Sequence, residues 1–183
     1  MENKSQATTK TLVQSFVSID SKSLLWTGTL LALSIIAPAL LAHTPQNQWV
    51  TGTVVNLILF AAALKLSPAN ALLIAVLPSS VALMRGLLPA PMATIIPFII
   101  AANFALIIVF QLFIKFQPKR LVLGVVISSL VKFGLIFAVT LFFANILNSK
   151  LIIMLQWPQL ITALAGGLIF AGIVSFYSKK KSA

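Results

Sequence analysis

Two cations, Arg85 and Lys132, fall inside long apolar runs of the sequence. The chain has only two acidic residues, Glu2 and Asp20, and both precede the first apolar run. An ionised lysine or arginine in mid-membrane is disfavoured by about 2.5–3.5 kcal/mol on insertion scales, so each needs a compensating partner. Because no carboxylate of this chain can supply one there, the pattern favours binding of an anionic solute. Snorkelling of Arg85 to the headgroups, and water or a partner subunit beside Lys132, are the alternatives.

Neutral polar and aromatic side chains lie at a similar depth to these cations when the apolar runs are set side by side. The predicted substrate-binding residues are Trp49, Thr53, Asn56, Arg85, Asn103 and Lys132. Together they would form an outward-facing cup with amides and hydroxyls on its wall, aromatic rings at its rim and two cationic anchors. Interfacial tryptophans and helix-joining asparagines would explain several of the same residues without a ligand.

The composition indicates that membrane helices position these residues. Of 183 residues, 60% are apolar and 8% are charged, and the mean hydropathy is +1.07, against roughly 45–50% apolar and ~25% charged in soluble domains. A bilayer core of about 30 Å needs about 20 apolar residues in a helix. Six such runs occur, at 23–42, 49–66, 71–88, 92–114, 121–147 and 156–177. The sequence predicts an all-α polytopic membrane bundle of six transmembrane helices, one domain over 23–177, with basic tails at 1–22 and 178–183.

The distribution of lysine and arginine predicts the orientation of this bundle, since cations near span ends favour the cytoplasmic side. With six spans, ten cations fall on one side: Lys4, Lys10, Lys22, Lys65, Lys115, Lys119, Arg120, Lys179, Lys180 and Lys181. Both termini are therefore expected to be cytoplasmic, in a multi-pass protein of a prokaryotic plasma membrane. The net charge of +11 then reflects topology, and we expect no nucleic-acid partner.

Prolines mark two of the predicted spans. Pro78, followed by Ser79 and Ser80, lies within the third span, and Pro97 lies within the fourth. A proline inside a helix frees backbone carbonyls that hydroxyls or water can satisfy. Such breaks often line binding sites, although they are also common kinks.

Small residues recur at helical spacing in the first and last spans. Gly28 and Ala32 are four residues apart near the cytoplasmic end of the first span, and Ala163, Gly167 and Ala171 repeat that spacing in the sixth. A small-xxx-small face lets another helix approach closely. Packing within the bundle is the default interpretation, and docking of a second protein is the alternative.

Several classes of function lack the residues they need. The chain has one histidine and no cysteine, and it contains no Ser/His/Asp set, no HExxH and no phosphate-binding glycine loop. We therefore expect no enzyme activity, no catalytic residue, no metal site and no cofactor. Ion-driven carriers usually rely on membrane carboxylates, and without a nucleotide-binding motif ATP hydrolysis would have to come from a partner.

Three segments together resemble a known family. The segments QWVTGTVVN at 48–56, LPSSVALMRG at 77–86 and IPFIIAAN at 96–103, with the small-residue pair on the first span, resemble the substrate-binding S components of energy-coupling factor (ECF) transporters. The resemblance covers about residues 23–177 and is greatest to an uncharacterised branch, sometimes loosely described as iron-hydrogenase-related.

That resemblance implies a binding subunit for a vitamin or other micronutrient. It also implies two kinds of partner, a transmembrane coupling protein and a pair of cytoplasmic ATPases. The first helix of the family carries an AxxxA-type motif that faces the coupling protein, and Gly28 and Ala32 match its spacing with Gly in place of the first Ala. Nickel and cobalt members use an N-terminal histidine segment that this sequence lacks, so metal import is not expected.

Three functions remain open on the sequence alone. A solute-binding subunit would bring Asn56, Arg85, Asn103 and Lys132 to one cavity, whereas a non-transporting anchor or scaffold of a redox or hydrogenase complex would have tightly packed outer halves. An isolated facilitator or channel would need a path through the inner half of the bundle. For the first function, a carboxylate- or phosphate-bearing solute is favoured, although water could hydrate either cation and a lysine in a dry site could be neutral.

Overall fold

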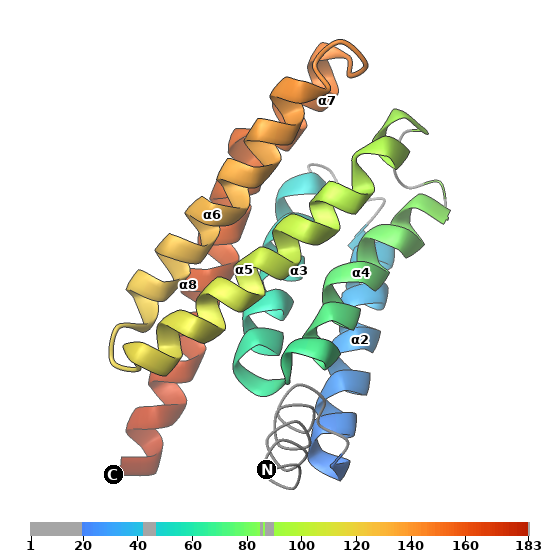
Figure 1. Cartoon of the computed structure of the whole chain (residues 1–183). Coiled ribbons are helices and arrows are strands. Elements are labelled where there is room, and N and C mark those ends of the chain that lie inside the picture. The colour runs from blue at the N-terminus through green and yellow to red at the C-terminus, as the bar shows by residue number, and fades with distance from the viewer. Residues whose placement is uncertain (1–19, 42–46, 85, 87–89, 183) are drawn as a thin grey trace, which may run out of the picture.

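The computed structural model describes residues 20–41, 47–84, 86 and 90–182, and this part of the chain contains helices and no strand (Figure 1). In chain order the helices are α2 (Ser21–Leu41), α3 (Asn47–Lys65), α4 (Pro68–Met84), η1 (Ala90–Thr94), α5 (Ile96–Phe116), α6 (Leu121–Phe142), α7 (Ser149–Leu155) and α8 (Trp157–Ser182). Five stretches are long and apolar enough to cross a membrane, and the 17-residue α4 is a shorter apolar helix. The prediction of an all-helical fold compatible with a membrane bundle is confirmed.

Proline and asparagine set several helix boundaries. Pro68 begins α4, and a proline fits the first turn because its missing N–H has no intrahelical acceptor there. Pro97 also lies in a first turn, that of α5, so the prediction that it interrupts a span is wrong. Pro78 does lie inside α4, as predicted. Asn148 caps α7, where its Oδ1 accepts a hydrogen bond from the N–H of Leu151 at 2.9 Å.

The helix ends differ from the predicted spans at several points. α6 ends at Phe142, five residues before the predicted end at 147, because the chain turns over 143–146 before α7. α8 continues through Ser182, so most of the predicted tail at 178–183 is helical. α2 begins at Ser21, inside the predicted tail 1–22, and residues 1–19 lie outside the described part. The predicted third span extends to residue 88, but residues 85, 87 and 88 lie outside the described part of the chain.

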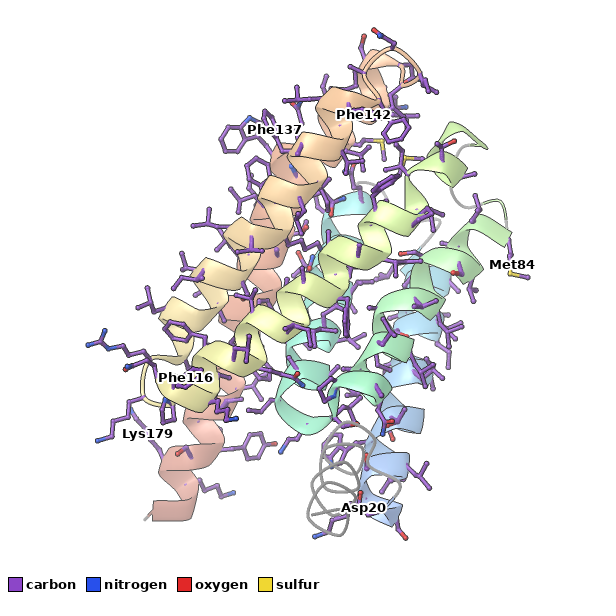
Figure 2. All side chains as sticks on the ribbon, in the orientation of Figure 1. Asp20, Met84, Phe116, Phe137, Phe142 and Lys179 are labelled. Atoms are coloured by element: carbon purple, nitrogen blue, oxygen red, sulfur yellow. The ribbon has the colours of Figure 1, made fainter. Side chains whose placement is uncertain are left out.

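The basic residues gather at one end of the bundle, where α2, α4 and α6 begin and α3, α5 and α8 end (Figure 1). We call this the basic end, defined by Lys22, Lys65, Lys115, Lys119, Arg120, Lys179 and Lys180. The opposite end carries η1 and α7 and is called the α7 end. Figure 2 shows Asp20 and Lys179 towards the basic end and Phe142 and Met84 towards the α7 end. Asp20 is the only acidic residue in the described part of the chain.

Helix α3 lies at the centre and packs against α2, α4, α5 and α8. Three aromatic rings fill the bundle beside it, because Phe60 contacts Phe110 at 4.9 Å and Phe170 at 6.1 Å between ring centroids. The three rings lie about 20 Å along their helices from the α7 end, at 1.5 Å per residue. This aromatic cluster belongs to the main buried core, in the half of the bundle nearer the basic end.

The small residues of α8 pack inside the bundle. Ala163 and Ala171 are buried, and Gly167 lies so close to α6 that an added Cβ would be 2.3 Å from a methyl of Val125. Gly166 approaches α3 equally closely, since an added Cβ would be 2.5 Å from the carbonyl oxygen of Thr53. The default interpretation of the small-residue pattern on α8 is therefore confirmed.

Large apolar side chains cover the outside of the helices. Leu25 and Leu40 of α2, Phe142 of α6 and Phe176 of α8 are each exposed over more than two thirds of their surface. Soluble proteins rarely expose contiguous apolar surface on this scale, whereas lipid tails solvate it. The outer surface supports a multi-pass membrane protein.

One polar contact between helices gives a test of the fold. The side chain of Gln111 on α5 donates a hydrogen bond from Nε2 to the carbonyl oxygen of Leu66, at the end of α3, over 2.9 Å. Replacing Gln111 with methionine removes the donor, and we expect the free energy of unfolding to fall by about 1 kcal/mol. Thermal unfolding in detergent would measure this as a decrease in Tm of about 2–4 °C. Gln117→Met, at an exposed glutamine just beyond α5, is the control, and an equal decrease in both variants would contradict the assignment.

Candidate functional site

A cavity of about 290 Å³ lies inside the bundle, in the half nearer the α7 end. Every helix from α2 to α8, with η1, contributes to its wall. Its polar lining consists of Gln48, Thr51, Asn56, Ser79, Asn103, Lys132 and Gln159. The rest of the lining is apolar apart from backbone, and includes Pro38, Val55, Met92, Ile99, Met154 and Leu155. A few polar groups in a mostly apolar wall are typical of small-molecule sites.

Lys132 is buried in this wall, with 3% of its surface exposed. Its Nζ donates a hydrogen bond of 2.7 Å to Oδ1 of Asn56, which is itself 2% exposed. α6 packs mainly against α5 and α8, so the lysine reaches across the bundle to the central helix α3. An ammonium has three N–H donors, and among the described residues Asn56 supplies the acceptor for one of them. The site therefore contains a buried lysine whose hydrogen-bond partner among the described residues is a neutral amide.

The amide of Asn56 is held in one orientation. Its Nδ2 donates to the carbonyl oxygen of Gly52 at 2.8 Å and to Oγ1 of Thr162 at 3.4 Å. Thr162 on α8 in turn donates to the carbonyl oxygen of Pro158 at 2.8 Å. Because Nδ2 is occupied by a carbonyl, Oδ1 is the atom that faces Lys132. The arrangement joins α6, α3 and α8 at the bottom of the cavity.

Asn103 supplies a second amide to the cavity wall, from α5. It is 4% exposed, and its Oδ1 has no hydrogen-bond partner. A buried polar atom without a partner costs about 1–3 kcal/mol, and such atoms in folded proteins call for a functional or structural reason. Asn103 therefore retains an unused hydrogen-bond acceptor, Oδ1, in the same cavity wall as Lys132.

We call the part of the cavity that lies nearest the α7 end its mouth. Gln48, in the first turn of α3, donates from Nε2 to the carbonyl oxygen of Met154 on α7 at 2.9 Å, which fixes α7 over the start of α3. Asn56 lies eight residues further along α3, about 12 Å deeper at 1.5 Å per residue. The cavity thus has polar groups at its mouth, including Gln159 of α8, and the lysine pair at its base.

Three of the six predicted binding residues meet in this cavity. They are Asn56, Asn103 and Lys132. Trp49 is 39% exposed, and Thr53 is partly buried; neither is among the residues that line the cavity. Arg85 lies outside the described residues.

The predicted docking pair lies elsewhere on the molecule. Gly28 and Ala32 are both exposed on α2, and an added Cβ at Gly28 would meet no atom within 4 Å. The pair is therefore on the surface of the bundle and away from the cavity.

Sequence reasoning missed most of the supporting residues. Pro38, inside α2, lines the cavity, and the rule applied to Pro78 could have found it. Thr162 and Gly166, which hold Asn56 from α8, carry no sequence signal that separates them from other small residues in the same helix. The apolar wall residues also look like lipid-facing residues when read from the sequence alone.

Comparison of the chain with family models, curated proteins and solved structures gives no match. The fold and the site therefore define the class by themselves, an all-helical protein of apolar helices compatible with a membrane bundle, with an internal cavity that contains a buried lysine. Among the described residues, no group of three histidine, cysteine, aspartate or glutamate side chains could hold a metal ion.

Proposed function

We propose that this protein is the membrane-embedded substrate-binding subunit of an ECF-type micronutrient importer, and that it binds a small anionic solute in the cavity. The observation that carries the proposal is Lys132, an almost fully buried cation in the cavity wall with one neutral acceptor. A buried ammonium is stable only when it is paired and hydrogen-bonded. A bound anion would provide that pairing.

A purely structural role for the lysine is less well supported. Buried charges contribute little to stability, since well-packed apolar residues of similar volume are often neutral or stabilising in their place. A neutral side chain would be sufficient to join α6 to α3. The cavity beside Lys132 and the unpaired Oδ1 of Asn103 also distinguish this region from a packed scaffold core.

The orientation of the site follows from the basic end. Lysine and arginine near span ends favour the cytoplasm, so the α7 end and the mouth of the cavity would face outward, with both termini in the cytoplasm of a prokaryotic cell. The aromatic cluster of Phe60, Phe110 and Phe170 fills the bundle between the cavity and the basic end. This arrangement favours a binding subunit over an isolated channel.

Partners would supply the energy for release and transport. The family resemblance implies a transmembrane coupling protein with two cytoplasmic ATPases, and it assigns the docking face to the first helix. The exposure of Gly28 and Ala32 on α2 supports that assignment, because a small-xxx-small pair on an open surface permits close approach of a second helix.

Replacing Gly28 with leucine tests the docking face. Since no atom lies within 4 Å of the added Cβ, the isolated bundle should fold normally, but a closely packed partner helix would be displaced. We expect co-purification of the coupling protein to fall at least several-fold while retained small molecules are unchanged. Gly134→Leu, at another open glycine on α6, is the matched control. Normal assembly of the Gly28 variant would exclude this docking face.

Affinity purification of the tagged protein from its native membrane in mild detergent tests the function itself. Mass spectrometry would identify co-purifying proteins and retained small molecules. A coupling protein with paired ATPases, or one stoichiometric metabolite, would support the importer subunit. Redox-enzyme subunits without a metabolite would support the alternative, a non-transporting anchor or scaffold of a redox or hydrogenase-type complex.

A further inference from the structure

The charge and chemistry of the cavity wall narrow the class of ligand, and this inference rests on the proposed binding function. We infer that the ligand is a small monocarboxylate with a largely apolar body, bound with its carboxylate at the base of the cavity against Lys132, and with a neutral polar group at the mouth.

The charge on the described part of the cavity wall favours a single negative charge on the ligand. Lys132 is the only charged residue among the described residues that line the cavity. One buried cation compensates one negative charge, and any further charge would remain buried without a partner. A phosphate monoester carries about −1.5 to −2 at pH 7, which exceeds what one lysine neutralises.

The donors at the base of the cavity fit a carboxylate. Lys132 has N–H donors beyond the one used by Asn56. The unpaired atom of Asn103 is Oδ1, an acceptor, so the donors for a carboxylate come from Lys132. A carboxylate has two oxygens that accept hydrogen bonds in one plane, and charge-assisted bonds from an ammonium are the stronger kind. Phosphate sites more often present arginine forks or a nest of backbone N–H groups, and no arginine is among the described residues that line the cavity.

The middle of the cavity has an apolar wall that fits a hydrocarbon body of the ligand. Val55 on α3 lines the cavity one residue nearer its mouth than Asn56, and Ile99 on α5 lines it one turn nearer the mouth than Asn103. Met92 and Leu155 also line the cavity. An apolar ligand body gains about 25 cal/mol per Å² when it leaves water for such a wall. A sugar or polyol would instead leave several hydroxyls without partners.

The mouth and the size define the other end of the ligand. The neutral amide and hydroxyl groups in the part of the wall nearer the mouth belong to Gln48, Thr51 and Gln159. The volume of about 290 Å³ is at the low end for small-molecule pockets, which span about 300–1,000 Å³. A carboxylate and a neutral hydrogen-bonding group, separated by an apolar body on the order of 12 Å or less, match these positions.

Counting carboxylates on retained molecules tests this inference. Wild-type protein and Lys132→Gln would be purified in parallel from the same cells. Glutamine has no charge but keeps an amide N–H donor for Asn56, and equal Tm in the preparations would show that the link between helices is kept. Small-molecule extracts would be coupled to light or heavy aniline with a water-soluble carbodiimide, which adds one label per carboxylate. Lys150→Gln, at an exposed lysine of the α7 end, is the matched control.

The expected result is one compound at least tenfold enriched in wild type and in Lys150→Gln over Lys132→Gln, with one label and no phosphorus. An enriched compound with two labels, a phosphate or no label would overturn the monocarboxylate inference and leave the binding function standing. An enriched long-chain fatty acid would overturn the inference that the ligand is small. A fatty acid that is equally abundant in all three preparations is instead membrane lipid carried through the purification. If no compound is enriched in wild type, with monodisperse protein and similar Tm in all three preparations, the binding function fails as well.

Discussion

Lys132→Met is expected to lose its ligand and keep its fold. Truncating one partner of a buried, hydrogen-bonded charge pair costs about 2–5 kcal/mol in binding, which corresponds to a decrease in affinity of about 30-fold or more. The bundle loses a buried charge, which is neutral or favourable when the replacement has similar volume. It also leaves Oδ1 of Asn56 without its donor, which costs about 1–3 kcal/mol. These effects oppose each other, so Tm should change by only a few degrees.

The measurement is the amount of metabolite retained per mole of purified protein, alongside Tm without ligand. Lys150→Met removes a cation from an exposed position at the same end of the bundle and should retain the metabolite fully. Unchanged retention in Lys132→Met, at normal yield, would remove the lysine from the site. A collapse in yield with the same loss in Asn56→Leu would instead indicate a pair that only joins helices.

Gly166→Leu should destabilise the bundle and the site together. A Cβ at Gly166 would lie 2.5 Å from the carbonyl oxygen of Thr53 and 2.7 Å from the backbone nitrogen of Leu57. Backbone atoms cannot rotate away as a side chain can, so α3 and α8 must separate. Overpacking of this kind costs about 1–3 kcal/mol or more, and we expect Tm to fall by about 5–10 °C. Asn56, whose Cβ would be 3.0 Å from the same added atom, would move with α3, and ligand retention should fall as well.

Gly172→Leu is the matched control, because Gly172 lies on the same helix with no atom within 4 Å of an added Cβ. Both variants gain the same helix propensity, so the difference between them isolates the contact with α3. Thermal unfolding of the two variants in one detergent makes the comparison. Equal Tm values would show that the two helices do not need the glycine.

Depth in the bundle could be predicted from the sequence, because position along a helix depends only on counting residues at 1.5 Å each. Asn56, Asn103 and Lys132 were placed at a common depth in this way, and they meet in one cavity. Rotation about the helix axis could not be predicted. Trp49 and Thr53 are on the same helix as Asn56 but are not among the residues that line the cavity, and helices that are apolar on all sides give no pattern to mark the inner face.

The extent of the helices was predictable only where polar residues interrupt them. The end of α6 at Phe142 lies within an apolar run that continues to Leu147, so length alone suggests a longer span. The signal for the break is Asn148, whose side chain caps the next helix. The close approach of α3 to α8 was also hidden, because a glycine at a contact and a glycine facing outward look the same in sequence.

The aromatic cluster of Phe60, Phe110 and Phe170 has an electrical consequence for a cell that makes this protein. Three rings packed across the bundle below the cavity insulate one face of the membrane from the other, because ions do not enter an apolar layer without their hydration shell. Under the proposed function, a copy without partners would therefore dissipate no ion gradient. A cell could then keep many idle copies in its membrane at no cost to its proton-motive force, and the number of such subunits would not need to match the number of any partner.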